Sequence, residues 1–530
     1  MLRGLVALFA LGLTVAGCGR QSRVDPGAKG QVLHLGNGAE PKDVDPNTQE
    51  AEIEWVIDSA LFEGLVNIAN DGETVLPGVA ERWDISPDGK TYTFHLRANA
   101  RWSDGSPVTA DDFEYAFRRV FTPSIGSENN VYGYAIAGAR AMNEGKSTWL
   151  GVHAVDARTL VVQLENRTPY ILVILSGTPF EPVPRALVER FGGGTRPGTA
   201  WTRPGNIVSN GPFTLAAWRS NQELVAIRNP YYWDHAHVRL REVHFYPTDD
   251  LGAEERAFRS GQLDVTYQLP QSKIAAYRDR HDPALRITPQ LCSVYLMFNV
   301  TAPPFADSRL RRALALAVDR DKIVPTVGQG AYTSGHSLTR PGTDHYSPPS
   351  FPDFNPALAR QILAEAGYPG GHGFPAVTLR VATGPLRELA EAIQEAWRHN
   401  LGVKVEIQTQ EQKTYFDALR TKDYSVSLMR FFYGVNAPET MLMVAQSESQ
   451  WNWAGWKSPG FDQAYHDATA APDEAARRGA FDRMERQIFT DSAYAPIAFL
   501  NQAHLVSPKL KGWRENAIYQ IDWRELSIEP

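Results

Sequence analysis

The stretch LPGVAERWDISPDGKTYTFHLRANARWSDGSPVTADDFEYAFRR, residues 76 to 119, decides the fold because turn, strand and helix signals follow one another within it. Ser86-Pro87-Asp88-Gly89 consists of turn-forming residues and leads into Thr91 to Leu96, where polar and apolar side chains alternate. This alternation predicts a strand with one buried face. A second turn at residues 103 to 107 separates the strand from the segment that follows.

That following segment predicts a helix from about Ala110. The hydroxyl of Thr109 is suited to accept a free amide hydrogen, and Asp111 and Asp112 suit the positive end of the helix dipole. Phe113, Phe117 and Val120 recur at helical spacing and are expected to pack inward. We expect the charged side chains to remain in water, namely Asp112, Glu114, Arg118 and Arg119.

Length and composition indicate a large exported protein. With 530 residues and 43 % hydrophobic side chains, the chain is long enough for about three domains. Its net charge of −7 lacks the basic excess that phosphate binding requires, so nucleic acid is not an expected partner. Residues 1–18 have a basic start, a short apolar core and Val15-Ala16-Gly17-Cys18, which predicts a lipoprotein signal peptide with lipidation at Cys18. Residues 19–30 are polar and suit a flexible tether.

The rest of the chain alternates strand and helix patterns. Residues 150–164 read as a hairpin, and residues 309–323 as one amphipathic helix. Helices are expected over 357–367, 385–400 and 473–490, and strands over 377–383 and 403–409. The strand, helix, strand order around residue 390 is typical of a parallel sheet.

The sequence of residues 77–113 resembles the signature of the family 5 solute-binding proteins of bacterial ABC importers. This family includes oligopeptide-, dipeptide- and nickel-binding proteins. Asp43-Val44-Asp45-Pro46, residues 61–65 (LFEGL) and residues 229–233 (NPYYW) resemble further family motifs. The resemblance implies an α/β fold of cluster C, type II, with two lobes, a hinge between them and an extra third domain. It also implies a monomer, with the permease and ATPase subunits of an ABC transporter as partners.

The resemblance suggests how the chain divides into domains. Lobe I is expected to comprise residues 31–62, 186–290 and 500–530. The extra domain II is expected over residues 63–185, and lobe II, formed by domain III, over residues 291–499.

Sequence motifs for catalysis are missing. We find no Gly-x-Ser-x-Gly elbow, His-Glu-x-x-His pair or phosphate-binding Gly-x-x-x-x-Gly-Lys loop, so we expect neither enzyme activity nor a metal or other cofactor. A secreted hydrolase and a periplasmic chaperone are alternative functions from other classes.

The cysteines differ from the pattern of the resembled family. With Cys18 lipidated, Cys292 has no partner and is expected to be a buried free thiol. Many oligopeptide-binding members pair the cysteine at this position with a second one, and Phe432 stands in its place here. The family's aspartate for the peptide ammonium follows shortly afterwards, and Gly434 stands at that position. Glu439 and Asp423 are nearby acids that would substitute for it.

The resemblance gives a set of candidate ligand-binding residues. A peptide receptor needs an acid for the ligand's ammonium, a cation for its carboxylate and permissive side-chain pockets. Glu50 matches a family acid at the cleft, and Arg430 lies beside the Gly434 segment, which suits a carboxylate-bearing ligand. The full set of candidates is Glu50, Gln412, Arg430, Phe431, Phe432, Tyr433, Gly434, Asn436 and Trp453.

The predicted function is capture of oligopeptides in the periplasm or at the cell surface, by a protein held on a membrane by lipid. Because Gly434 stands where the family has an aspartate, a second ligand class is an alternative, namely a modified or cell-wall peptide, a nickel chelate or a saccharide.

Overall fold

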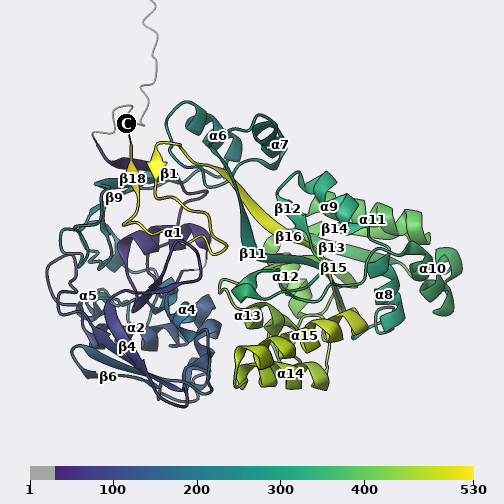
Figure 1. Cartoon of the computed structure of the whole chain (residues 1–530), viewed down its shortest axis with the longest axis horizontal. Helices are drawn as coiled ribbons and strands as arrows, with labels where there is room; N and C mark the ends of the chain where they lie inside the picture. Colours follow the sequence, from purple (N-terminus) through teal and green to yellow (C-terminus); the bar gives the residue numbers. More distant parts are fainter. Residues whose placement is uncertain (1–29, 50, 530) are drawn as a thin grey trace, which may run out of the picture.

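A computed structural model describes residues 30–49 and 51–529 and shows two lobes joined by two long strands (Figure 1). The strands β11 (Leu285–Phe298) and β16 (Tyr494–Leu505) pair antiparallel. Their register shifts between Pro289 and Ser293, at the place where the pair passes from one lobe into the other. The two crossing strands form the connection expected of a hinge.

The first lobe contains two four-stranded sheets. One has the order β1-β10-β9-β8, with β1 parallel to β10, and the other has the order β4-β5-β7-β6 and is antiparallel. The strands are β1 (Val32–Gly36), β2 (Val66–Ile68), β3 (Val75–Pro77), β4 (Ala80–Ile85), β5 (Thr91–Leu96), β6 (Val152–Asp156), β7 (Thr159–Gln163), β8 (Phe213–Arg219), β9 (Glu223–Arg228), β10 (Glu242–Tyr246), β17 (Leu510–Lys511) and β18 (Ser527–Ile528). The helices are α1 (Glu52–Leu61), α2 (Ala110–Val120), α3 (Ala139–Asn143), α4 (Ile171–Leu175), α5 (Arg185–Arg190), α6 (Leu251–Arg259) and α7 (Gln271–Asp279).

The stretch at residues 76–119 folds largely as its sequence predicts. Strand β5 has alternating burial, and the 150–164 hairpin forms as β6 and β7. Helix α2 starts at Ala110, where the Asp112 carboxylate accepts hydrogen bonds from the N–H and hydroxyl of Thr109 at 2.9 and 3.0 Å. The expectation that Arg119 stays in water is wrong, because Arg119 is 2 % exposed and forms a buried ion pair with Asp45.

The second lobe is built on one six-stranded sheet of order β12-β16-β11-β15-β13-β14. The predicted parallel pair is confirmed as β13 and β14. The strands not yet described are β12 (Tyr332–Ser334), β13 (Val377–Ala382), β14 (Val405–Gln410) and β15 (Val426–Phe432). The helices are α8 (Ser308–Leu316), α9 (Arg320–Gly328), α10 (Pro356–Glu365), α11 (Arg387–Leu401), α12 (Gln412–Arg420), α13 (Pro438–Leu442), α14 (Pro459–Thr469) and α15 (Glu474–Asp491).

The single helix predicted over residues 309–323 is wrong, because two helices, α8 and α9, occupy this region. Asp319 begins the second helix, since its carboxylate accepts the backbone N–H of Lys322 at 3.1 Å. Apolar periodicity continues across the break, which is why the sequence pattern did not reveal it.

Two apolar cores correspond to the two lobes. The first combines buried residues from both sheets of the first lobe, and the second surrounds the six-stranded sheet and also includes Ile274 and Tyr277 of α7. Val435 and Ala437 follow β15 in the second lobe but belong to the first core, so this segment packs across the boundary. An ion pair of 3.1 Å between His345 Nε2 and Glu73 Oε2 also joins the lobes. Among the described residues, no helix is long and apolar enough to cross a membrane.

Candidate ligand-binding cleft

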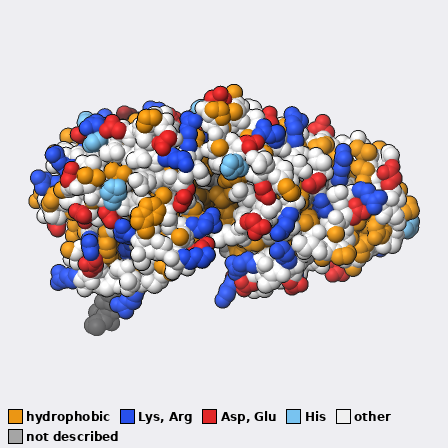
Figure 2. All heavy atoms as spheres, turned by 90° about the horizontal axis from the view of Figure 1, so that it is seen from below, with side chains coloured by type: hydrophobic (Ala, Val, Ile, Leu, Met, Phe, Trp, Pro, Cys, Tyr) orange, Lys and Arg blue, Asp and Glu red, His pale blue; other side chains and the backbone are white. Residues whose placement is uncertain are grey.

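A chamber of about 720 Å³ lies between the two lobes, and Figure 2 shows a hollow at this boundary with hydrophobic side chains inside it. Helix α1 contributes Glu52 and Trp55 to its lining. Strand β15 and the segment after it contribute Arg430, Phe432 and Gly434 from the opposite side. We call this space the main chamber. Its lining from both lobes means that a ligand inside would contact both at once.

A second space of about 770 Å³, the aromatic chamber, adjoins the main chamber and shares Asn129, Tyr132, Arg430 and Phe432 with it. Its wall is aromatic on the second-lobe side. The Phe431 ring packs edge-on against Trp451 at 5.3 Å between centroids, and Trp453 packs against Phe416 at 5.6 Å. Such a surface suits apolar or aromatic groups of a ligand.

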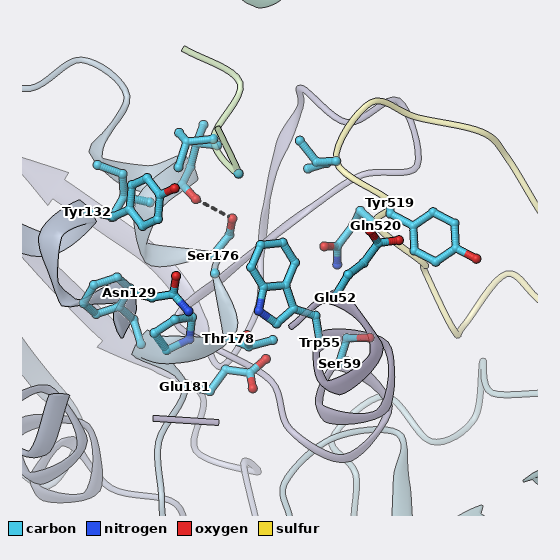
Figure 3. Close-up of a pocket in the computed structure, with 18 of the residues that line it drawn as sticks. Glu52, Trp55, Ser59, Asn129, Tyr132, Ser176, Thr178, Glu181, Tyr519 and Gln520 are labelled. Atoms are coloured by element: carbon cyan, nitrogen blue, oxygen red, sulfur yellow. Dashed lines mark hydrogen bonds between the residues drawn. The ribbon is translucent and has the colours of Figure 1, made fainter. Parts of the chain in front are cut away.

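The third space, the side pocket, is smaller, at about 110 Å³, and opens from the main chamber beside Trp55 (Figure 3). Glu52, Trp55, Tyr132 and Gly434 line both spaces. Away from the main chamber the pocket is lined by polar side chains, namely Ser59, Asn67, Ser176, Thr178, Glu181 and Gln520, and by apolar ones, namely Val56, Phe62, Val173, Ile174, Pro179 and Phe180. The three spaces therefore form one cleft with a narrow acidic extension.

Six of the nine predicted binding residues line this cleft. Arg430 and Phe432 face both large chambers, Gly434 lines the main chamber and the side pocket, and three residues line the aromatic chamber, namely Gln412, Phe431 and Trp453. The Arg430 side chain is exposed, and its guanidinium carbon lies 5.7 Å from the Phe432 ring centroid.

Two predicted residues point elsewhere, and one is outside the described part. Tyr433 is 0 % exposed, and its hydroxyl accepts the N–H of Arg340 at 3.1 Å within the second lobe. Strand β15 ends at Phe432, and the next side chain, Tyr433, lies in the core, whereas Phe432 and Gly434 on either side of it line the cleft. The Asn436 side chain accepts the N–H of Asp344 at 3.0 Å and lines none of the three spaces. Glu50 lies outside the described residues, as does Cys18.

The Trp55 ring occupies the space beside Gly434. A Cβ atom placed on Gly434 would lie 3.0 Å from Cη2 of Trp55, closer than carbon atoms normally approach. The Gly434 backbone also hydrogen-bonds the Tyr132 hydroxyl from the other lobe. An aspartate at position 434 would therefore require Trp55 to move, so the missing acid and the tryptophan are two parts of one local arrangement.

The acids that were expected to replace the missing aspartate do not line the cleft. Glu439 is 0 % exposed and forms two hydrogen bonds with Arg477, of 2.7 and 2.8 Å. The Asp423 side chain is 86 % exposed and lies 4.0 Å from Arg380. The acids that do line the cleft are Glu52 and Glu181.

Both cleft acids are held in surroundings that disfavour their charged form. Burial raises the pKa of Glu52 to about 7, although a hydrogen bond from Gln502 opposes this rise. Burial also raises the pKa of Glu181 well above its ordinary value, and the nearby Glu63 carboxyl adds to the rise. One oxygen of each carboxyl, Oε1 of Glu52 and Oε2 of Glu181, is buried with no hydrogen-bond partner. Such groups favour a bound cation or donor.

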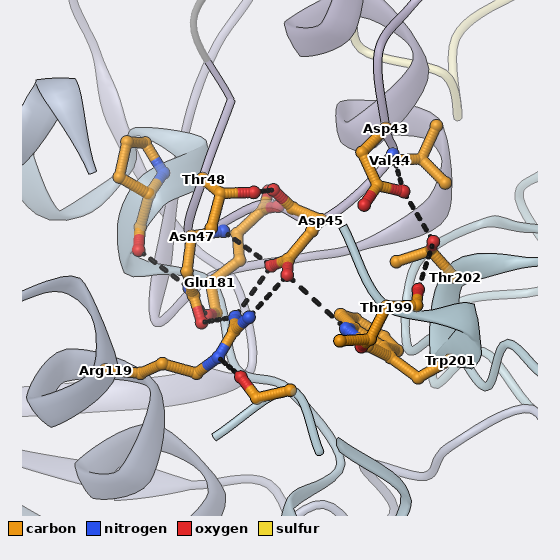
Figure 4. Close-up of polar contacts among 12 residues, drawn as sticks. Asp43, Val44, Asp45, Asn47, Thr48, Arg119, Glu181, Thr199, Trp201 and Thr202 are labelled. Atoms are coloured by element: carbon orange, nitrogen blue, oxygen red, sulfur yellow. Dashed lines mark hydrogen bonds and ion pairs between the residues drawn. The ribbon is translucent and has the colours of Figure 1, made fainter. Parts of the chain in front are cut away.

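A buried network holds the Glu181 segment in place (Figure 4). Arg119 at the end of α2 forms hydrogen bonds with both oxygens of Asp45 at 2.7 and 2.5 Å, and a third with Asn47 at 3.0 Å. The Asn47 amide donates to the carbonyls of Pro179 and Glu181 at 2.9 and 3.3 Å. The stretch at residues 76–119 thus positions a wall of the side pocket through its last residue.

Cys292 is a buried free thiol, as predicted. It lies opposite Phe432 in the β11–β15 register, which is the pairing expected if Phe432 replaces a second cysteine. Burial raises the pKa of the Cys292 thiol to about 12, so the thiol stays protonated and unreactive.

Comparison with known proteins identifies the family. The model of the bacterial extracellular solute-binding proteins, family 5, matches residues 74–453. The chain belongs to this family. Family 5 members are substrate-binding proteins rather than enzymes. Within residues 30–49 and 51–529, no cluster of three or more His, Cys, Asp or Glu side chains has the arrangement of a metal site.

Family 5 relatives match nearly the whole chain. The periplasmic oligopeptide-binding protein OppA of Escherichia coli is 36 % identical over 502 residues, covering 92 % of this chain and 90 % of OppA. The structure of Haemophilus influenzae OppA with the peptide RPPGFSPFR has a TM-score of 0.79 and 29 % identity, covering 96 % of this chain and all of that one. The structure of the Escherichia coli murein tripeptide-binding protein MppA has a TM-score of 0.80 and 32 % identity, and the match covers 94 % of this chain and 99 % of that one.

Sequence reasoning missed Glu52, Trp55 and Glu181. Glu52 and Trp55 are three positions apart on α1, so helical spacing alone places them on one face. Glu181 has no comparable signal, because it lies in an irregular segment whose position depends on Asn47 and Arg119.

Proposed function

We propose that this protein is the solute receptor of an ABC importer and captures short peptides outside the cytoplasm for delivery to the permease and its ATPase subunits. The observation that carries the proposal is a main chamber lined by both lobes, with Glu52 and the side pocket of Glu181 on one side and Arg430 on the other. A peptide has an ammonium and a carboxylate at its ends, which these groups complement. The family and its peptide-binding relatives support the same function.

Native mass spectrometry of the chain from Gly19 onward, purified without denaturation, tests this function. We expect a set of bound masses that sequence as short peptides after release. A single bound non-peptide species would contradict peptide capture.

Gly434 and Trp55 favour a second candidate ligand class, a modified or cell-wall peptide. A side chain at position 434 would have to displace the Trp55 ring, and Gly434 offers no acid there, so the arrangement favours a ligand without a free ammonium group at that point. The relative MppA is described as a murein tripeptide-binding protein. Among the released masses, blocked or cross-linked peptides would select this candidate over free peptides, whereas a nickel chelate or a saccharide is not favoured by any specific contact.

The N-terminal residues support attachment to a membrane by lipid. We infer that cleavage before Cys18 and acylation of its thiol place the protein in the periplasm or at the cell surface. Labelling cells with a radioactive fatty acid tests this inference. The wild-type chain should incorporate label, and Cys18→Ser should not; equal labelling of both would contradict it.

The domain organisation proposed for the chain remains lobe I (31–62, 186–290 and 500–530), domain II (63–185) and lobe II (291–499), acting as a monomer. The boundaries at residues 290/291 and 499/500 coincide with the register shift in the β11–β16 pair. Scattering measurements with and without ligand should show a monomer that becomes more compact when ligand binds.

A further inference from the structure

The side pocket is an acidic compartment without a cation of its own. Its lining, as the described residues form it, contains Glu52 and Glu181 but no Lys or Arg. The nearest buried arginine of the supporting network, Arg119, is paired with Asp45. The negative charge that both carboxyls carry when ionised is therefore not neutralised from within the pocket.

Glu181 is a buried acid with unused hydrogen-bonding capacity. Its side chain lies beneath Trp55 and beside Thr178 in Figure 3, and the residue is only 4 % exposed. Its Oε2 atom has no partner. An acid buried in this way is costly unless a donor or a cation reaches it, and the pocket is open to the main chamber where a ligand would lie.

Trp55 supplies an aromatic wall between the two acids. In the amide orientation that satisfies both ends of Gln49, the Trp55 Nε1–H donates to Gln49 at 3.0 Å, and the Gln49 amide donates to Asp58 at 3.2 Å. This bond fixes the ring against α1. The ring face then borders the pocket as a surface on which a cation is stabilised.

We propose that the side pocket binds a primary ammonium or guanidinium group of the ligand, held by Glu181 at the inner end, Glu52 at the mouth and the Trp55 ring between them. The volume of about 110 Å³ accommodates such a group on a short alkyl chain. The ligand class is thus a peptide with a basic side chain that enters the side pocket. This inference rests on the proposed function, because it assigns one compartment of the same cleft.

A neutral polar group is the competing occupant, and proton release separates the two. The Glu63 carboxyl adds to the raised pKa of Glu181, and Glu181 in turn adds to the raised pKa of Asp58. The Glu52 carboxyl adds to the raised pKa values of Tyr267, Tyr519 and Cys292. A cation favours ionised carboxyls, so its binding releases protons. A hydroxyl or amide group leaves the acids protonated and releases none.

The experiment compares matched ligands by calorimetry on the chain from Gly19 onward. Two tripeptides differ only in one side chain, lysine or its uncharged analogue norleucine. We expect the lysine peptide to bind at least about tenfold more tightly in wild type, the effect of a hydrogen bond to a charged group. Glu181→Gln should reduce that preference to about threefold or less, and the ratio of the two affinities in each variant is the quantity compared. Glu406→Gln, an exposed acid of β14, serves as the control.

Equal affinities of wild type for both peptides would overturn the subsite but leave peptide capture intact. If neither peptide binds, the proposed function fails for this class, and n-butylammonium compared with butanol then tests the pocket directly by thermal shift. Stabilisation by the ammonium in wild type but not in Glu181→Gln supports the subsite, and equal effects overturn it. Glu52→Gln, at the more open mouth, provides the same test if Glu181→Gln does not fold.

Discussion

The two walls of the cleft differ in charge and in burial. The first-lobe wall carries Glu52 and Glu181, both with an unpartnered buried oxygen, and is held by the Arg119–Asp45 network. The second-lobe wall carries an exposed Arg430 among the rings of Phe431, Phe432, Trp451 and Trp453. The first wall is built to discriminate charge, since its acids are desolvated and fixed. The second wall offers broad aromatic contact and one exposed cation.

The largest expected effect comes from removing the support of the acidic wall. Arg119→Met leaves Asp45 buried without its partner, which should cost about 3 to 5 kcal/mol of unfolding free energy. The neighbouring Arg118→Met removes a pair with Glu114 that is 36 % and 24 % exposed and should cost less than about 1 kcal/mol. Urea denaturation measures both. Equal losses would show that the buried network does not support this wall.

The next effect concerns the contact between the two walls at Gly434. Gly434→Asp places its side chain against Trp55 where the two walls meet, which should weaken ligand binding by about 1 to 3 kcal/mol. Combining it with Trp55→Ser should cost less than the sum of the two single losses, because the ring no longer occupies the space. Ligand affinity by calorimetry is the measurement. Strictly additive losses in the double variant would contradict the coupling.

The pH dependence of affinity sharpens the contrast between the walls. Burial raises the pKa of Glu52 to about 7, so Glu52 is mostly ionised at pH 7.5 and mostly protonated at pH 6. A cationic ligand requires the ionised form, and its affinity should therefore fall as pH falls, by about eightfold over this interval. Glu52→Gln should make the profile less steep and leave the part that comes from Glu181, whereas Arg430→Met should not change its slope. A flat wild-type profile would contradict the role of Glu52.

The smallest expected effect concerns Arg430. Because this side chain is exposed, Arg430→Met should weaken binding of a peptide with a free carboxyl end by only about threefold to fivefold. The same peptide with an amide end should be unaffected. Arg398→Met, on the exposed face of α11, is the matched control. If the amide and acid peptides lose affinity equally, Arg430 contributes packing rather than charge recognition.

Local pattern was sufficient for much of the fold and part of the cleft. Alternation placed β5 correctly, and the family match placed Phe432 opposite Cys292, as the register confirms. Prediction from local pattern failed where the burial or position of a side chain depends on a partner distant in sequence. Arg119 is typical of an exposed helix end until Asp45 is brought beside it, and Glu181 reaches the cleft only through contacts from residues more than 100 positions earlier. Long-range burial of charged groups leaves no periodic trace in the sequence.

A crystal structure of the chain from Gly19 onward with a lysine-containing tripeptide tests the central claim most directly. We expect the lysine Nζ to lie in the side pocket, about 3 Å from a carboxylate oxygen of Glu181, and the peptide carboxylate to lie on the Arg430 side of the cleft. A side pocket filled by an apolar group or by the peptide carboxylate would contradict the assignment of charge to the two walls.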